Sequence, residues 1–286
     1  MNYIIISPIR DEEEHIEKTL DAVITQTILP YQWILVDDGS ADRTGAIIDS
    51  YGKKYSWMTI CHRSNRGFRK AGCGVIEAFY DGFSAIKRQD FDYIVKLDGD
   101  LSFKPDYFEK CFKHFTLNPR LGIGGGTIFN LVSGQLKIEK VPRFHVRGAT
   151  KIYTKACWAA IGGLIKAPGW DTLDEVKANM KGFKTQTFPD LPLTHYRYTG
   201  GAEGTWKNWI KNGRGSYICG YHPIFVFVKC LIRMFKKPYV LMSLALFWGY
   251  FSGYFVKEGR ISDKELIQYI RKQQINRLLF RKSIWE

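Results

Sequence analysis

Short apolar runs alternate with amphipathic segments along residues 2–97. The apolar runs end in turn-forming or acidic residues, which is typical of buried strands. The segments between them carry apolar side chains three and four positions apart, the spacing of one helix face; in the first segment these are Ile16, Leu20, Val23 and Ile24. We expect strands near 2–7, 33–36, 58–60 and 93–97, and helices over 12–26, 42–51 and 70–87.

Strands that alternate with helices predict an α/β domain with a mainly parallel central sheet. In such sheets ligands bind beyond the carboxyl ends of the strands. Three acidic turns fall at predicted strand ends, at 8–11, 37–40 and 98–100. The sequence therefore predicts a ligand site at this edge of the sheet.

The pattern changes after Pro105. The glycines of Gly122–Gly126 predict a turn ahead of a β-rich stretch, and 171–181 has a helical pattern that ends at Gly182, a suitable helix C-cap. Residues 201–223 are rich in glycine and aromatic side chains.

The C-terminal part holds an uncharged aromatic segment, 239–256, with basic residues at both ends. This segment is borderline for a membrane span, which needs about 20 apolar residues. A second apolar patch covers 223–231, and the tail from 262 to 286 is amphipathic and basic. The two apolar segments predict a hairpin or interfacial helices on the cytoplasmic face of a membrane. The alternative is an amphipathic helical cap on the α/β domain.

The charge is concentrated in the same part of the chain. The whole chain has a formal net charge of +14, and residues 203–286 contribute 15 Lys and Arg against 5 Asp and Glu. An anionic membrane surface, phosphorylated substrates or nucleic acid would each suit this charge. We find no nucleic-acid-binding motif, and the aromatic setting favours a membrane.

The 6 cysteines follow no metal-binding spacing, and the first residues predict a strand rather than a signal peptide. We therefore expect reduced thiols and a cytoplasmic protein, peripheral on the inner face of the cell membrane.

Asp98 and Asp100 lie one residue apart, directly after the predicted strand 93–97. Two carboxylates at a strand end suit a hard divalent cation, which in phosphate chemistry keeps several waters and bridges to substrate oxygens. An ordinary acidic loop is the alternative.

A second acidic turn, Asp37-Asp38-Gly39-Ser40, also follows a predicted strand. An acid at a strand end can accept hydrogen bonds from a base or a ribose, as it does in nucleotide-binding folds. Ser40 or Asp42 can also cap the next helix.

The two turns, about 60 residues apart in an α/β pattern, resemble the family 2 glycosyltransferases, which have the GT-A fold. The matching residues are Ile6-Ser7-Pro8-Ile9-Arg10-Asp11-Glu12, Val36-Asp37-Asp38-Gly39-Ser40, Asn65-Arg66-Gly67 and Leu97-Asp98-Gly99-Asp100. The resemblance covers residues 1 to about 200. It implies a nucleotide-binding half over about 1–105 and an acceptor-binding half over about 106–200, followed by a flap and a helical, membrane-facing C-terminal segment over 201–286.

The resemblance also implies roles for individual residues. The nucleotide-sugar, most often a uridine diphosphate sugar in this family, would contact Pro8, Arg10, Asp11, Asp38, Lys70 and Asp98. The family usually has Asn where Asp11 stands. Asp100 would ligate a divalent metal, Mn²⁺ or Mg²⁺, with Asp98 shared between the metal and the ribose. A later histidine completes the metal shell in several GT-A enzymes, which makes His195 a candidate ligand, with a structural histidine as the alternative.

An inverting enzyme of this kind needs a carboxylate that deprotonates the acceptor hydroxyl. In the family this base precedes a helix that ends in Gly plus an aromatic residue, here Gly182-Phe183, and the resemblance implies Asp171. The family often shows Glu-Asp where this chain has Trp170-Asp171. Asp174 and Glu175 stay open as alternatives, as does a simple N-cap role for Asp171.

The region Arg197–Arg214 is expected to be a mobile flap, in which Trp206 and Trp209 either stack on an acceptor sugar or pack the flap. The resemblance thus implies an inverting hexosyl- or N-acetylhexosaminyltransferase with a saccharide or lipid-linked acceptor, active in cell-surface polysaccharide or glycolipid assembly. Two other classes stay open: a nucleotidyltransferase that makes sugar nucleotides, and a basic membrane- or nucleic-acid-binding protein. The segment after the first strand, Ser7–Asp11, lacks the glycine-rich loop that is usual in such nucleotidyltransferases.

Overall fold

We describe a computed structural model of the 286-residue chain. The structure describes residues 1–68, 73–132, 134–139, 141–197, 205–235 and 239–285. The strands are β1 (Tyr3–Ile9), β2 (Gln32–Asp37), β3 (Met58–His62), β4 (Tyr93–Leu97), β5 (Leu101–Phe103), β6 (Leu121–Val132), β7 (Gln135–Ile138), β8 (Thr150–Thr154) and β9 (Lys184–His195). The helices are α1 (Ile16–Ile24), α2 (Thr44–Lys54), α3 (Cys73–Ser84), α4 (Tyr107–Leu117), α5 (Lys155–Ile161), α6 (Trp170–Met180), α7 (Thr205–Ile218), α8 (Pro223–Arg233), α9 (Tyr239–Phe255) and α10 (Lys264–Leu278).

Within these ranges the strands form one sheet in the order β3-β2-β1-β4-β8-β6-β9-β5, with β7 paired to β6. The first four strands are parallel, as the alternation of strands and helices predicts. The second half is mixed, because β8 runs antiparallel to β4 and β6, while β9 is parallel to β6. The fold is therefore α/β, with its parallel part in the first half of the chain.

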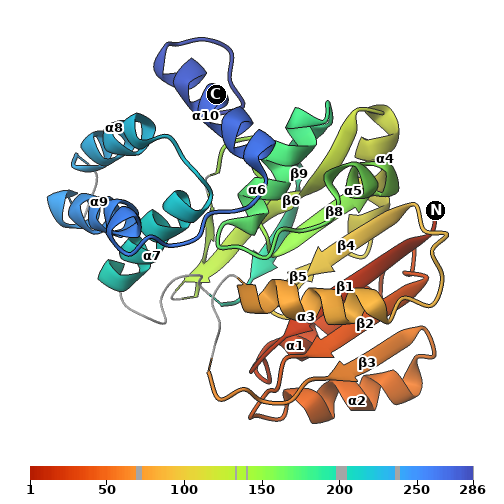
Figure 1. Cartoon of the computed structure of the whole chain (residues 1–286). Coiled ribbons are helices and arrows are strands. Elements are labelled where there is room, and N and C mark those ends of the chain that lie inside the picture. The colour runs from red at the N-terminus through yellow and green to blue at the C-terminus, as the bar shows by residue number, and fades with distance from the viewer. Residues whose placement is uncertain (69–72, 133, 140, 198–204, 236–238, 286) are drawn as a thin grey trace.

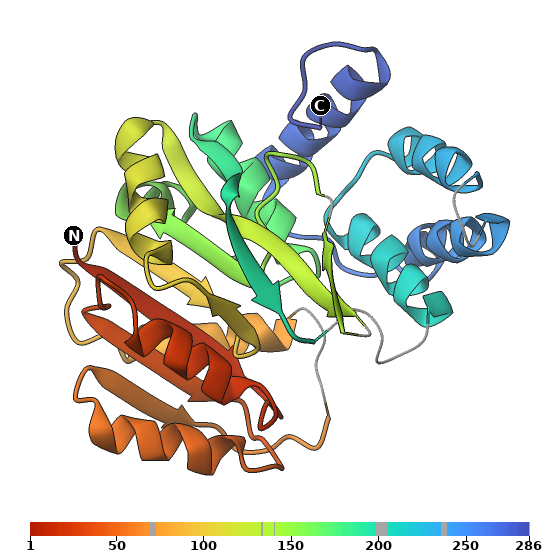
Figure 2. The same ribbon diagram turned by 180° about the vertical axis from the view of Figure 1, so that it is seen from behind.

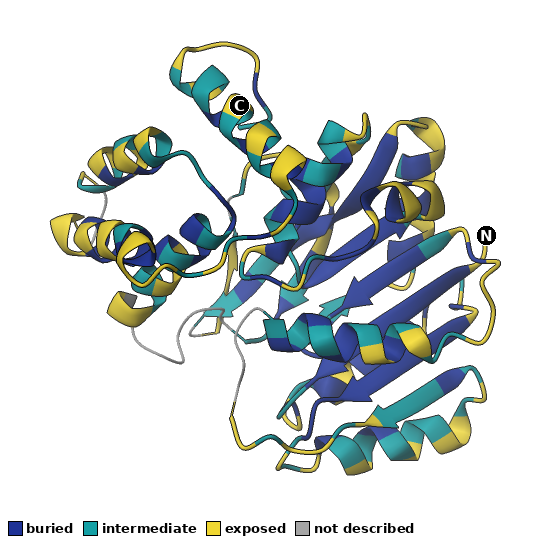
Figure 3. Ribbon diagram, in the orientation of Figure 1, coloured by how far each residue is buried: buried dark blue, intermediate teal, exposed yellow. Residues whose placement is uncertain are grey.

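Helices cover both faces of the sheet. Ile4 and Ile6 of β1 face α3, α5 and α6, whereas Tyr3 and Ile5 face α1, α2 and α4. Figure 1 shows α3 in front of the sheet, and Figure 2 shows α1 and α4 covering the other side. Because both faces are covered, β1 and β2 are buried along their whole length, which explains their continuous apolar runs (Figure 3).

The glycine-rich segment Gly122–Gly126 is a strand, not a turn, and this prediction was wrong. It forms the first half of β6. A Cβ atom on Gly124 would lie 2.4 Å from the Phe188 ring, and one on Gly125 would lie 2.6 Å from the carbonyl oxygen of Thr150. The glycines are therefore needed for close packing rather than for chain reversal.

The C-terminal helices form two groups. Figure 1 shows α7, α8 and α9 together beside the sheet, and α10 above α6. Leu266 and Ile270 of α10 pack against Leu173 and Val176 of α6, so α10 caps the α/β domain. In the described part of the chain, no helix has the length and apolar content that a membrane crossing requires.

Helices α7 and α9 approach each other through glycine. A Cβ atom on Gly213 would lie 2.2 Å from the carbonyl oxygen of Leu246, and one on Gly249 would lie 2.1 Å from that of Ile210. The second half of the expected flap is thus a helix packed on α9, whereas 198–204 lie outside the described residues. Small residues on α9 face the protein, and several large apolar ones, including Leu244 and Trp248, face outward.

Candidate active site

The three acidic turns meet at the carboxyl edge of the parallel strands. The Asp38 amide donates to the carbonyl oxygen of Ile9 at 2.8 Å, which joins the ends of β1 and β2. The Asp98 amide donates to the carbonyl oxygen of Ala149 at 2.8 Å, which brings the segment before β8 to the end of β4. The predicted ligand edge is therefore formed by both halves of the chain.

The first wall of the site is a network of acids and arginines. Arg10 Nη1 donates to the carbonyl oxygen of Asp38 at 3.0 Å. The two carboxylate oxygens of Asp38 pair with Arg63 and Arg66, and Asp38 is buried. Pro8 lies buried in β1, beside Val36 of β2. The wall therefore presents a buried carboxylate whose charge is already compensated.

Asp11 ties this wall to the next turn. Its backbone has φ 53°, a left-handed conformation that Asp and Asn tolerate better than other non-glycine residues. Its amide donates to Ser40 Oγ at 3.0 Å, and its carboxylate accepts from the Ala41 amide at 2.9 Å. Asp11 thus fixes the loop after β2, while Lys70 lies outside the described residues.

The Asp37–Ser40 turn has its own supports. Gly39 has φ 71°, and a Cβ atom there would lie 2.5 Å from Asn65 Cα, so only glycine fits. The Thr44 amide at the start of α2 donates to Asp42 Oδ1 at 3.0 Å. The N-cap of α2 is Arg43, so neither of the two expected capping residues holds that position, and Ser40 Oγ binds the Asp11 amide instead.

Asp100 and His195 lie in contact although 95 positions separate them in the sequence. His195 Nε2 is 3.1 Å from Asp100 Oδ2, and both residues are buried. His195 Nδ1 is 3.0 Å from Asn130 Oδ1, and Asn130 Nδ2 is 3.4 Å from the Glu139 carboxylate. Glu139 accepts from the Asn130 amide nitrogen, so Asn130 Oδ1 must accept from His195 Nδ1.

This arrangement suits a bound cation. With Nδ1 protonated, a neutral His195 turns the lone pair of Nε2 toward a carboxylate, which is unfavourable unless a proton or a metal ion lies between them. Asp100 Oδ1 is buried and accepts no hydrogen bond from the described residues. An aspartate oxygen without a partner, beside an imidazole whose other nitrogen is held by the Asn130 side chain, fits a divalent metal.

The same residues do not form a complete metal shell. Within the described ranges, no group of three or more His, Cys, Asp or Glu side chains gathers around one point. Asp98, the expected third ligand, pairs with Lys96, whose Nζ also donates to the carbonyl oxygen of Gly148 at 2.5 Å. Burial raises the pKa of Asp98, with Lys96 opposing and Asp100 adding to the rise. Waters and diphosphate oxygens would therefore have to supply further ligands.

Asp171 lies at the start of α6, next to this edge. A Cβ atom on Gly148 would lie 2.8 Å from the Trp170 ring and 3.4 Å from Asp171 Cβ, so the segment before β8 separates Asp98 from Asp171. The Asp171 side chain is 23% exposed, and its Oδ2 is 3.8 Å from Arg147 Nη1. The N-cap of α6 is Gly169, so Asp171 is not the N-cap residue.

The surroundings of Asp171 keep its carboxylate charged. Burial alone would raise the pKa of Asp171, but the charges of Lys151, His145 and Arg147 outweigh burial and lower it below the ordinary value. Asp171 also lines a cavity of about 360 Å³, together with Arg147, Trp209 and Lys229. An ionised carboxylate that opens on a cavity can accept a proton from a bound hydroxyl.

Asp174 and Glu175 have different surroundings. Both are buried and both pair with Lys151, at 2.8 Å and 2.9 Å. Asp174 Oδ1 also accepts from the Glu175 amide at 2.7 Å, and its Oδ2 accepts from Tyr153 Oη. Glu175 accepts from the Val146 amide at 2.6 Å and contacts His145 at 2.8 Å. Neither carboxylate is open to a substrate.

Two buried lysines organise the site and were not among the predicted residues. Lys96 and Lys151 lie 5.4 Å and 5.5 Å from the ring centroid of Trp170. Burial would lower the pKa of Lys151, but Asp174 and Glu175 outweigh it and raise the pKa. The sequence signal that could have identified them is a lysine within a strand segment: Lys96 in Tyr93–Leu97 and Lys151 in Thr150–Thr154. A charge in such a strand requires a buried partner.

Comparisons with known proteins agree on the fold and the family of the first half. Residues 4–137 match the family described as glycosyl transferase family 2. The chain is 34% identical over 82 residues to the uncharacterized glycosyltransferase EpsJ of Bacillus subtilis, which covers 28% of this chain and 24% of that protein. It is 29% identical over 143 residues to the poly-beta-1,6-N-acetyl-D-glucosamine synthase of Staphylococcus epidermidis, which covers 49% of this chain and 32% of that protein. The chain thus spans a third or less of the length of these curated relatives.

Solved structures resemble almost the whole chain. The mannosyltransferase PcManGT from Pyrobaculum calidifontis, in complex with GDP-Man and Mn²⁺, has a TM-score of 0.57 and 14% identity, over 99% of this chain and 76% of that chain. S. aureus TarS 1–349, in complex with UDP-GlcNAc, has a TM-score of 0.55 and 12% identity, over 96% of this chain and 81% of that chain. At this level of identity the likeness is one of fold, and it makes the fold GT-A-like.

Proposed function

We propose, from the membership of residues 4–137 in glycosyl transferase family 2, that the whole chain is an inverting glycosyltransferase. It moves a hexosyl or N-acetylhexosaminyl group from a nucleoside diphosphate sugar to an acceptor hydroxyl. The observation that carries the proposal is the position of Asp171, whose partly exposed carboxylate opens on a cavity beside the Asp98–Asp100 edge.

The nucleoside occupies the wall formed by Pro8, Arg10, Asp11 and Asp38, with Lys70 and Asp98 as further contacts. A carboxylate offers about four acceptor positions, so Asp38 can accept from Arg63 and Arg66 and still accept from a base N–H. A uridine diphosphate sugar is the first donor to test, because the family resemblance favours uridine and the TarS complex contains UDP-GlcNAc. The PcManGT complex contains GDP-Man, so a guanosine donor is the second.

Asp100 and His195 would hold a divalent metal, Mn²⁺ or Mg²⁺, and Asp98 would be shared between the metal and the ribose. The unpartnered Asp100 Oδ1 and the lone pair of His195 Nε2 support this assignment. When bound, the metal supplies positive charge that stabilises the leaving diphosphate. Asn130 orients His195 through Nδ1.

Asp171 is the general base. It takes the proton of the acceptor hydroxyl, whose oxygen forms a bond to the anomeric carbon. The bond from that carbon to the diphosphate oxygen breaks, the nucleoside diphosphate leaves with the electron pair, and the configuration at the carbon inverts. Asp174 and Glu175 act as positioning residues, because they hold Lys151 against the backbone of Asp171.

We infer that the C-terminal helices bind the cytoplasmic face of a membrane. Small residues of α9 pack against α7, and large apolar ones face outward; Trp248 is 59% exposed. A water-soluble helix has the opposite distribution. Basic residues in the same part of the chain would add attraction to anionic lipid. This surface suits a lipid-linked acceptor, as in assembly of surface polysaccharide or glycolipid.

A panel of nucleotide-sugars tests the function. The full chain is mixed with UDP- and GDP-sugars, with and without Mn²⁺ or Mg²⁺, and donor binding and slow donor hydrolysis are measured. We expect one nucleotide class to bind and to be hydrolysed only with the metal. If none of the donors shows metal-dependent binding, the proposal is wrong.

A further inference from the structure

A second cavity lies between the C-terminal helices and adjoins the cavity at Asp171. It measures about 500 Å³ and is lined by residues of α7, α8, α10 and the C-terminal end. Trp209 and Lys229 line both cavities, so the two share a boundary. An extended molecule could therefore reach from the second cavity to the carboxylate of Asp171.

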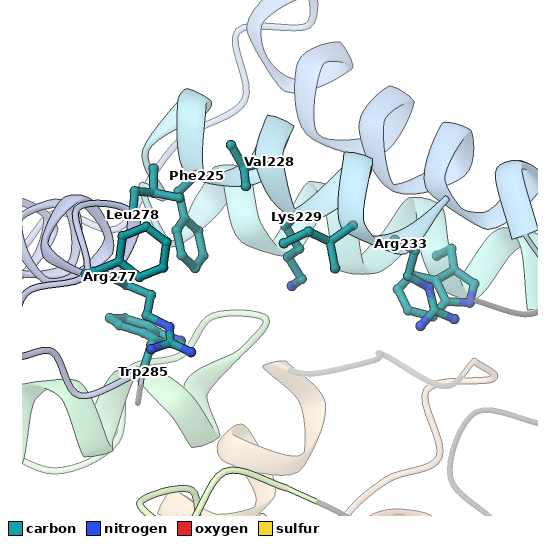
Figure 4. A pocket seen from close by; sticks show the side chains of 10 residues that line it. Phe225, Val228, Lys229, Arg233, Arg277, Leu278 and Trp285 are labelled. Atoms are coloured by element: carbon teal, nitrogen blue, oxygen red, sulfur yellow. The ribbon is translucent and has the colours of Figure 1, made fainter. Parts of the chain in front are cut away.

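The walls of this cavity are mainly apolar and aromatic. Phe225, Val228 and Ile232 come from α8, Leu278 from α10, and Trp285 from the C-terminal end. Figure 4 shows Phe225, Val228 and Leu278 close together at one end of the cavity, with Trp285 nearby. This volume and lining suit a hydrocarbon chain rather than a sugar.

Cations also line the cavity, and none of the described residues that line it is acidic. Lys229 and Arg233 are four positions apart, so they lie on the same side of α8, as does Phe225 one turn earlier. Arg277 of α10 adds a third positive charge to the cavity (Figure 4). In the described part of the chain, no carboxylate pairs with these three cations. The Arg233 guanidinium lies 3.8 Å from the ring centroid of Trp209, and its Nε is buried without a hydrogen-bond partner among the described residues.

Lys229 lies where the two cavities meet. Its side chain reaches solvent but is crowded by protein, and desolvation together with the charge of Arg233 lowers its pKa. An anion bound here would stabilise both charges. A phosphate group is the anion that suits two neighbouring cations at the end of an apolar cavity.

We propose that this cavity binds the hydrocarbon chain of an amphipathic lipid phosphate, with the phosphate against Lys229 and Arg233 and the head group directed toward Asp171. The occupant is thus the acceptor itself, and the proposal rests on the glycosyltransferase function argued above. The outward apolar side chains of α8 and α9 would let such a lipid enter from a membrane.

Binding of simple probes tests the site without a donor. The full chain is titrated with decyl phosphate, decanol and inorganic phosphate, each below its micellar or saturating concentration, by calorimetry. We expect decyl phosphate to bind at least tenfold more tightly than decanol, because only the phosphate meets the cations, and we expect inorganic phosphate alone to bind weakly.

Two variants locate the site. Arg233→Gln and Lys229→Gln should each weaken decyl phosphate at least tenfold and leave decanol unchanged, whereas Phe225→Ala should weaken both. Lys272→Gln, an exposed lysine of α10 that lines neither cavity, is the matched control and should bind like the parent chain. Binding of UDP with Mn²⁺ and the melting temperature show whether each variant is folded.

The outcomes separate this proposal from the function on which it rests. Equal binding of decyl phosphate and decanol, or unchanged binding by both α8 variants, would overturn the lipid phosphate site. A concentration-dependent dimer that excludes decyl phosphate would assign the cavity to a second copy of the chain instead. If the probe binds as expected but none of the nucleotide-sugars does, the glycosyltransferase function fails while the binding site stands.

Discussion

Lys151 Nζ lies 2.8 Å from Asp174 Oδ1 and 2.9 Å from Asp174 Oδ2, and both side chains are fully buried. Lys151 also donates to the backbone carbonyl of Asp171. One buried ammonium therefore joins the acids in the middle of α6 to the exposed acid at its start. Asp174 and Glu175 are therefore structural carboxylates, whereas the partly exposed carboxylate of Asp171 can contact a substrate.

Asp174→Asn is expected to destabilise the protein. The substitution removes a charge that compensates Lys151 in a buried setting, which costs up to about 3–5 kcal/mol. Glu175 still pairs with Lys151, so the protein should remain folded at low temperature. Urea denaturation measures the loss. Wild-type stability combined with abolished transfer would move the base assignment to Asp174.

Asp171→Asn should lower transfer by about 10²–10⁴-fold, because the amide cannot accept the hydroxyl proton. Donor binding and stability should stay close to the parent values, since the Asp171 side chain is partly exposed and only its backbone carbonyl binds Lys151. Single-turnover experiments measure the loss of transfer, and donor titration measures donor binding separately. Glu14→Gln, which removes an exposed carboxylate on the other half of the chain, is the control. Near-normal transfer by Asp171→Asn would contradict the assignment.

Asp100→Asn should abolish metal-dependent binding of the donor, because it removes the charge of the buried carboxylate that faces His195. Asn130→Ala should weaken Mn²⁺ binding by roughly 10–100-fold, since His195 would lose the acceptor that orients it. Manganese titration in the presence of UDP, followed by electron paramagnetic resonance, measures both. Thermal melting confirms folding. Unchanged manganese affinity in both variants would exclude this pair as the metal site.

Substitutions on the outer side of α9 should release the protein from membranes. Leu244→Glu together with Trp248→Glu places two charges among exposed apolar side chains. Each large apolar side chain contributes about 1.5–3 kcal/mol when it is buried, so binding should fall at least tenfold. Sedimentation with vesicles of phosphatidylglycerol and phosphatidylcholine measures the loss. Leu117→Glu, at a 73% exposed leucine of α4, is the matched control and should bind normally.

His62 should make stability depend on pH. Its hydrogen bonds to Asp49 and Asp37, each 3.0 Å long, raise its pKa above the ordinary value of 6.5. A raised histidine pKa stabilises the fold fully below the ordinary value, and this contribution is lost as the pH rises through the pKa of the folded state. His62→Gln should therefore reduce the free energy of unfolding more at pH 5.5 than at pH 8.5. Equal losses at both values would contradict the prediction.

The first half of the fold could be predicted because each of its strands and helices has a recognisable pattern in its own stretch of sequence. The apolar run at Tyr93–Leu97 and the turn after it need no distant partner to be recognised. The glycines of β6 could not be predicted in the same way, since the atoms that exclude their side chains belong to Phe188 and Thr150. A run of glycines favours a turn until the neighbouring strands are known.

The same difference between local and distant signals applies to the residues of the candidate site. Acids at strand ends were predicted by position, and the resemblance supplied His195, whose contact with Asp100 has no local signal. The role of the small residues of α9 was not predicted either. Gly249 and Gly253 dilute the apolar run in the sequence, but in the structure they are the contact points with Ile210 and Tyr217 of α7. Composition alone does not show which side of a helix a residue occupies.

Lys96 limits how this protein could be recombined with others. Its ammonium binds Asp98, in the proposed nucleotide-binding half, and the carbonyl oxygen of Gly148, in the proposed acceptor-binding half. A chimera that takes residues 1–105 from a protein without a cation at position 96 would leave the carbonyl oxygen of Gly148 without the ammonium that binds it. To change the donor or acceptor preference of this chain, individual residues of either half should therefore be substituted while Lys96 is retained.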